Sequence, residues 1–115
     1  MSWVDKKRVL DCLNELSDKS YQERVWMASS GPEISSYIEA VNQLYGDSGL
    51  DFAYSKGEQV FGKDIDDRLK QFGTTLQMMP LNRHPLELIK DQRMIPIRQT
   101  AADIANLIGQ KEQIL

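Results

Sequence analysis

DIDDRLKQFGTTLQMMP, residues 64–80, is the stretch that decides the fold class. Its apolar residues follow one another at steps of four, three and four: Ile65, Leu69, Phe72 and Leu76. Steps of this size place side chains on one face of an α-helix. Aspartates crowd the first turn, where the helix dipole favours negative charge, and Pro80 interrupts the pattern. The stretch therefore predicts an amphipathic helix that ends near Met79.

Helical patterns continue on both sides of this stretch. They cover residues 2–18, 36–46, 50–57, a short segment that begins at Pro85, and 100–109. Ser36 and Glu39 have capping-box spacing, and Gly46 and Gly109 stand where two of these helices are expected to end. Residues 20–28 suit a turn or an irregular piece, with Trp26 as its anchor in the core.

These patterns predict one architecture for the whole chain. We expect residues 1–115 to form a single all-α domain, a compact bundle of about five to six short helices. At most one short hairpin could form, from residues 20–28 and 56–62. A chain of 115 residues with 41% apolar content can bury one modest core.

Composition excludes several classes of function. The net charge of -3 and the absence of a long basic stretch argue against a nucleic-acid binder. TAADIANLIG, residues 100–109, resembles the first helix and turn of a helix-turn-helix unit, but the few residues after Gly109 are too short for a recognition helix. No segment has the roughly 20 apolar residues of a membrane span, and no signal peptide is evident, so we expect a cytoplasmic protein.

Residues with catalytic or metal-binding chemistry are few. One cysteine, Cys12, and one histidine, His84, cannot supply a zinc site of the Cys/His type. Cys12 lies on an apolar helical face, which predicts a buried thiol. The serines Ser29, Ser30, Ser35 and Ser36 lack a nucleophile motif and a positioned base, and His84 suits a helix cap. We expect no catalytic residue, no metal and no cofactor.

Charge along the chain is more informative. Residues 30–67 hold eight acidic and two basic residues, a net charge of -6, whereas residues 68–115 sum to +3. If the acidic side chains converge in space, they would steer a basic protein partner toward this region. The residues expected to contact that partner are Glu33, Glu39, Asp47, Asp51, Asp64 and Asp67, with Tyr45 and Tyr54 as aromatic anchors.

Two strings of this middle region carry a resemblance. YQERVW (residues 21–26) and SGPEISSYIEAVNQLYGDSGL (residues 30–50) resemble a family of small, uncharacterised bacterial proteins, over about residues 16–76. The family's role is unassigned, so the resemblance implies no catalytic residues. Where that family often has two aspartates, this chain has Gly46 and Asp47. The departure weakens any role that depends on a pair of carboxylates at this point.

Size, charge and the lack of catalytic equipment favour a non-enzymatic protein-binding domain. By analogy, the most concrete hypothesis is an immunity protein that neutralises a basic toxin domain in a bacterial contact-dependent or polymorphic toxin system. One alternative is a small enzyme with a carboxylate-bound metal at Asp64 and Asp67, with or without Glu39. Another is a helical adaptor that acts through residues 100–115.

Overall fold

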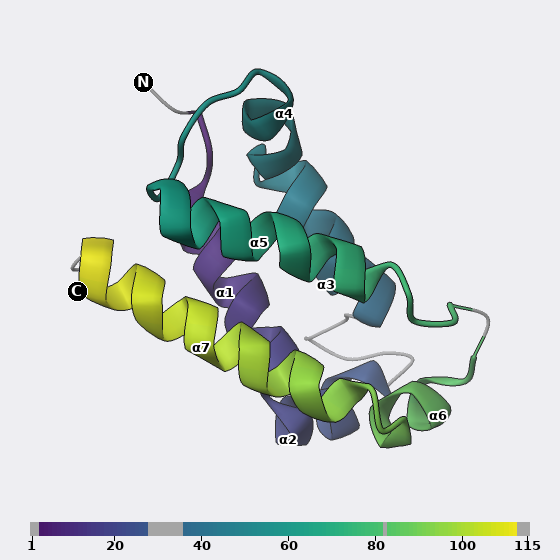
Figure 1. The fold of residues 1–115 in the computed structure, drawn as a ribbon. Helices are drawn as coiled ribbons and strands as arrows, with labels where there is room; N and C mark the ends of the chain where they lie inside the picture. The colour runs from purple at the N-terminus through teal and green to yellow at the C-terminus, as the bar shows by residue number, and fades with distance from the viewer. Residues whose placement is uncertain (1–2, 28–35, 82, 113–115) are drawn as a thin grey trace.

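The computed structural model describes residues 3–27, 36–81 and 83–112, and every regular element in these ranges is helical (Figure 1). Two π-helical turns, η1 and η2, directly continue α2 and α3, so these ranges form seven continuous helices. In chain order the elements are α1 (Lys6–Ser17), α2 (Lys19–Tyr21), η1 (Gln22–Trp26), α3 (Tyr37–Asn42), η2 (Gln43–Asp47), α4 (Leu50–Ser55), α5 (Lys63–Leu76), α6 (Pro85–Lys90) and α7 (Met94–Glu112). The prediction of an all-α bundle is confirmed, with one helix more than expected.

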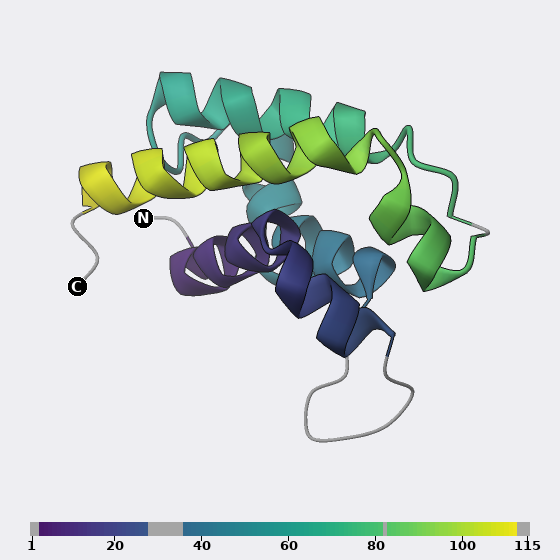
Figure 2. The same ribbon diagram turned by 90° about the horizontal axis from the view of Figure 1, so that it is seen from below.

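Three long helices form the centre of the bundle. α5 and α7 are antiparallel neighbours (Figures 1 and 2). Among pairs of described elements, α1 and α7 have the most extensive contact. The inward residues of α5 are the ones that the apolar spacing predicted: Ile65, Leu69, Phe72 and Leu76. α1 likewise buries Val9, Cys12, Leu13 and Leu16. Burial of such side chains is worth about 1.5–3 kcal/mol each and supplies most of the driving force for the fold.

The segment that follows α1 is helical, so the prediction of a turn or irregular piece at residues 20–28 is wrong for its described part. Asp18 caps α2 by accepting a hydrogen bond from the Tyr21 amide. Gln22 is fully buried, and its side-chain amide donates to the carbonyl oxygens of Glu15 and Leu16 at the end of α1 (3.0 and 2.9 Å). These carbonyls lack partners within α1, and satisfying them favours a helical path through Gln22. Trp26 is buried, as predicted.

The short hairpin that the sequence left possible is not present in the described residues, because residues 20–26 are helical and residues 56–62 form a loop. Gly57 and Gly62 have positive φ angles of 73° and 96° in that loop. None of the described helices is both long enough and apolar enough to cross a membrane.

Gly46 does not end the helix that begins after Ser36. The chain passes through Gly46 in the η2 turn, and the left-handed residue is Gly49, with a φ of 87°. Ser48 makes this corner: it is buried, its hydroxyl donates to the Leu44 carbonyl, and the same oxygen accepts from the Leu50 amide. We call α3, η2 and α4 together the α3–α4 arm.

α7 is twice as long as expected. The prediction of a helix over residues 100–109 is wrong at both ends, since α7 runs from Met94 to Glu112. Pro96 is the third residue of α7, where the missing amide hydrogen has no partner in any helix, so the proline does not interrupt it. Gly109 lies inside α7, and no turn of a helix-turn-helix unit exists there.

Candidate functional site

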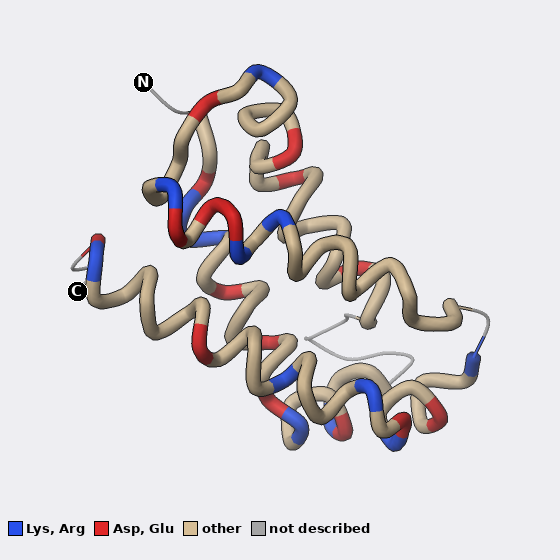
Figure 3. Tube along the Cα trace, viewed as in Figure 1, with Lys and Arg blue, Asp and Glu red and all other residues tan. Residues whose placement is uncertain are grey.

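The acidic residues of the middle region do not converge on one surface. Of the eight, Glu33 lies outside the described residues. Of the others, Glu39, Asp47 and Asp51 lie on the α3–α4 arm and Glu58 lies in the loop that follows it. Asp64, Asp66 and Asp67 lie in the first turns of α5, beside basic residues (Figure 3). Each group therefore has its own surroundings and its own role.

Asp64 and Asp67 are exposed and already have cationic partners on α5. Arg68 lies 3.3 Å from an Asp64 carboxylate oxygen, and Lys63 lies 2.8 Å from one of Asp67. The hydrogen bond from Lys63 lowers the pKa of Asp67 and raises the pKa of Lys63. These are exposed pairs of the helix surface, which contribute little to stability because solvent screens them.

Glu39 is remote from these two aspartates. Its backbone amide donates to the Ser36 hydroxyl (3.1 Å), which confirms the cap, but its carboxylate accepts from the Gln43 side chain (3.1 Å) instead of closing the capping box. Because Tyr37 contacts Leu76 at the end of α5, the start of α3 lies about 18 Å from Asp64 along the α5 axis. The arrangement does not bring Glu39 together with Asp64 and Asp67, and the described part of the chain contains no group of three metal-binding side chains.

The position of Asp66 suggested that it stabilises the first turn of α5 by its negative charge, but its contacts give it a different role. Its side chain is 3% exposed and accepts three hydrogen bonds, from the amides of Val60 and Phe61 (2.9 and 3.1 Å) and from the Tyr54 hydroxyl (2.8 Å). This carboxylate therefore ties the loop before α5, and the end of α4, to the first turn of α5. Three donors at bonding distance offset the cost of burying its charge.

Three tyrosines bridge the α3–α4 arm to α5. The hydroxyl of Tyr37 donates to the Leu76 carbonyl (2.6 Å), that of Tyr45 to the Leu69 carbonyl (2.7 Å), and that of Tyr54 to Asp66. Burial disfavours their charged forms and raises the pKa of each tyrosine well above its ordinary value. The two tyrosines expected as partner anchors, Tyr45 and Tyr54, thus have hydroxyls that are bound within the protein.

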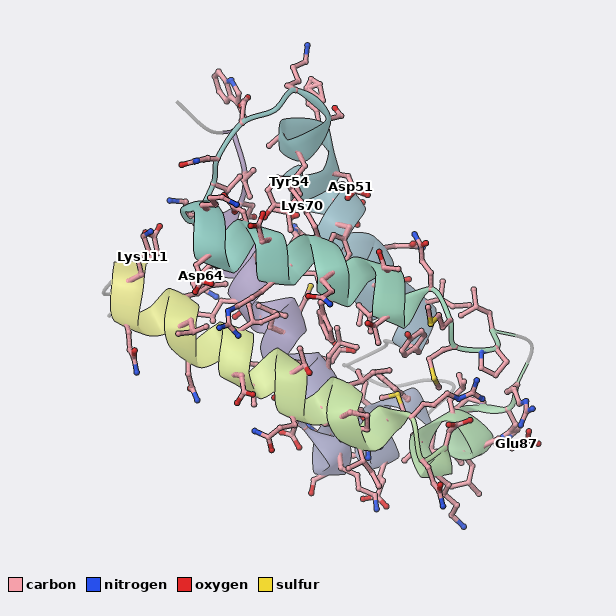
Figure 4. All side chains as sticks on the ribbon, in the orientation of Figure 1. Asp51, Tyr54, Asp64, Lys70, Glu87 and Lys111 are labelled. Atoms are coloured by element: carbon pink, nitrogen blue, oxygen red, sulfur yellow. The ribbon has the colours of Figure 1, made fainter. Side chains whose placement is uncertain are left out.

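Between these bridges the arm and α5 leave an open cleft of about 620 Å³. Figure 4 shows Asp51, Tyr54 and Lys70 gathered at this place, with Asp64 and Lys111 apart from them. The arm contributes Val41, Asn42, Tyr45, Gly46, Asp47, Asp51 and Tyr54, and α5 contributes Lys70, Gly73, Thr74 and Gln77. The structure therefore brings together four of the eight residues expected to bind a partner: Asp47, Asp51, Tyr45 and Tyr54.

The charges of the cleft are mixed but mainly negative. No described residue forms an ion pair or donates a hydrogen bond to the carboxylate of Asp47 or Asp51. Partial burial raises the pKa of Asp51. Among the described residues of the lining, Lys70 is the one basic residue, and its ammonium lies 4.9 Å from the centre of the Tyr54 ring. A cation at this distance from an aromatic ring is attracted by the ring's negative face.

Two exposed aromatic side chains lie on the same end of the fold, and the sequence patterns did not single them out. Trp3 is 90% exposed and Phe52 on α4 is 60% exposed. The backbone of Trp3 lies beside Gly49, directly before α4. For Phe52 a signal existed, because it falls outside the face of α4 that Leu50 and Ala53 bury.

The two residues considered for chemistry elsewhere have structural roles. Cys12 is buried, and burial raises the pKa of its thiol to about 12, which leaves no thiolate at neutral pH. His84 caps α6, since its Nδ1 accepts from the Leu86 amide (3.1 Å).

No family model, curated protein or solved structure matches the chain.

Proposed function

We propose that this protein is a non-enzymatic protein-binding domain that docks a basic partner at the α4 end of the fold. The observation that supports this proposal is the placement of Asp47 and Asp51, two carboxylates without an ion-pair partner among the described residues, in one cleft bordered by α4, the helix that also carries the exposed Phe52. Aromatic side chains are enriched among residues that dominate binding energy, and charges around them steer association. Trp3 extends the same end of the molecule.

The proposal assigns partner contacts to fewer of the residues that the sequence led us to expect at the binding surface. Asp64 and Asp67 contribute little, because Arg68 and Lys63 neutralise them. Tyr45 and Tyr54 shape the cleft, and the aromatic contacts with a partner come from Trp3 and Phe52. Asp47 and Asp51 provide the steering charge.

In its most concrete form, the partner is a basic toxin domain and the chain is its immunity protein. This form rests on the analogy in size and charge with immunity proteins of contact-dependent and polymorphic toxin systems. The protein would then act in the cytoplasm, where an incoming toxin is neutralised by a partner that covers its active site.

The test uses the proteins encoded beside this gene. Each neighbour is produced with and without the chain, cell growth is followed, and association of the purified pair is measured by surface plasmon resonance. We expect one neighbour to be toxic alone and harmless with the chain, and to bind it with at least micromolar affinity. If no neighbour binds, the immunity role is wrong.

A pair of charge-reversal variants tests the site. Asp47→Lys with Asp51→Lys should slow association several-fold at low salt, and the difference should shrink as salt is added. The matched control, Asp64→Lys with Asp67→Lys, makes the same change of net charge at the other acidic group. Equal slowing by both variants would show that only net charge matters, which would remove the proposed site.

A further inference from the structure

Glycines stand on both walls of the cleft between the arm and α5, and they have different surroundings. At Gly73 on α5, an added Cβ would lie 3.2 Å from Cζ of Tyr45, so the glycine lets this ring pack against the helix. At Gly46 on the arm, an added Cβ would meet no atom within 4 Å. The space beside Gly46 is therefore free for a side chain from outside.

The cleft already holds one cation of the protein itself. Lys70 places its ammonium over the Tyr54 ring and has no carboxylate within ion-pair distance among the described residues. Asp47 and Asp51 line the same space without a cation of their own. Two carboxylates and one ammonium leave a net negative charge in a partly desolvated space, which favours a second cation.

We propose that the cleft receives the guanidinium group of one arginine side chain of the basic partner, which pairs with Asp47 and Asp51 and displaces Lys70 from the Tyr54 ring. This inference rests on the proposed function and specifies how it recognises its partner. Arginine fits better than lysine because its planar guanidinium can donate to two carboxylates at once and stack on an aromatic ring, and because it is less strongly hydrated. Side-chain amides and hydroxyls of Asn42, Thr74 and Gln77 complete the polar lining.

A peptide that contains one arginine tests the inference without a known partner. Acetyl-Gly-Arg-Gly-amide is titrated into the ¹⁵N-labelled full chain, and amide shifts are followed by NMR. We expect saturable shifts centred on Gly46, Asp51 and Gly73, with a dissociation constant on the order of 1–10 mM, since one solvent-exposed charge contact is weak. The same peptide with citrulline, which is neutral and nearly isosteric, should give no shifts there. Equal shifts with both peptides, or none with arginine, would overturn the inference.

Substitution of Lys70 tests the inference by the direction in which the affinity for the arginine peptide changes. If the ligand is a cation, Lys70→Gln removes a competitor and a repulsive charge, and the arginine peptide should bind several-fold more tightly. The matched control is Lys90→Gln on α6, which removes the same charge from another exposed surface and should change binding by less than about two-fold. Weaker binding after Lys70→Gln would mean that Lys70 contacts the ligand, and the displacement would be wrong.

Variants that fill the cleft distinguish a failure of the arginine site from a failure of the proposed protein-binding function. Gly46→Leu adds bulk in free space and should abolish the shifts of the arginine peptide, whereas Gly109→Leu, at another helical glycine with free space around it, should not. Thermal unfolding of both variants checks that they fold. If Gly46→Leu leaves binding of a protein partner intact, the protein-binding function stands and the arginine site is wrong. If the arginine peptide binds as described but no neighbouring protein does, the site stands and the immunity role is wrong.

Discussion

Two helix interfaces of this protein are built in different ways. α7 packs extensively on α1 and buries small and branched side chains, among them Ala101, Ala105 and Ile108. The α3–α4 arm also packs on α1, but it meets α5 mainly through long tyrosines whose hydroxyls bond to α5. The first interface is the most extensive one between described elements, and the second leaves the cleft.

This difference places stability and binding in separate parts of the molecule. Close apolar packing gains dispersion and burial over its whole length. An interface bridged at three points is satisfied in its hydrogen bonds yet keeps a surface that a partner can enter. Substitutions in each interface test this contrast.

Leu13→Ala should cause the largest loss of stability. Leu13 is fully buried on α1, the helix that packs most extensively on α7, and its truncation removes apolar burial and leaves a cavity in the core. We expect the free energy of unfolding to fall by about 3–5 kcal/mol, measured by urea denaturation. A loss below about 1 kcal/mol would show that this interface can collapse around the cavity.

Asp66→Ala should rank second. The amides of Val60 and Phe61 and the Tyr54 hydroxyl would lose their acceptor in a buried place, for an expected loss of about 2–4 kcal/mol. Asp64→Ala, two residues earlier, removes an exposed pair and should cost less than about 1 kcal/mol. Equal losses would contradict the distinction between these neighbouring aspartates.

The tyrosine bridges predict a loss of stability at high pH. Their pKa values are raised in the folded protein, so the stabilisation they provide is complete below the ordinary tyrosine pKa of about 10 and is lost as the pH rises toward the raised values. The free energy of unfolding should therefore decrease from pH 9 to pH 11.

Tyr45→Phe sharpens this prediction. It removes one hydrogen bond, at a cost of about 1 kcal/mol near neutral pH, and it should also make the decrease above pH 10 less steep. Absorbance at 295 nm reports the ionisation directly. If all tyrosines of the folded wild-type protein ionise near pH 10, the bridges do not shield them from water.

Glycine substitutions give the smallest effects and compare the two walls of the cleft. Gly46→Ala should stabilise the protein by about 0.5–1 kcal/mol, as should Gly109→Ala, because each Cβ has free space in a helix. Gly73→Ala should be less stable than Gly46→Ala by about 1 kcal/mol, since its Cβ presses on Tyr45. Identical melting temperatures for these two variants would mean that Tyr45 shifts at no cost.

Local signals predicted those helices that are stabilised locally. Periodicity located α5, the proline at Pro85 located α6, and Ser36 marked the start of α3. One of the errors occurs where residues outside the segment decide its structure. α2 and η1 depend on contacts of Gln22 with the end of α1, which no local pattern contains.

The candidate site shows the same division. The sequence contained Asp47 and Asp51 as acidic residues, but their difference from Asp64 and Asp67 depends on which cations the helices bring near. Phe52 could have been found from its place outside the apolar face of α4. Trp3 could not, because its contact with Gly49 joins segments far apart in the chain.

By itself, the sequence determined the all-α class, the inward faces of α1 and α5 and the acidic balance of the middle region, since periodicity and charge are local properties. The tertiary structure decided that Asp66 is an internal anchor, that tyrosines bridge the arm to α5, and that a cleft remains between them. The physical reason is that hydrogen-bond partners, neighbouring charges and free space around a side chain depend on helices that the chain brings together only on folding.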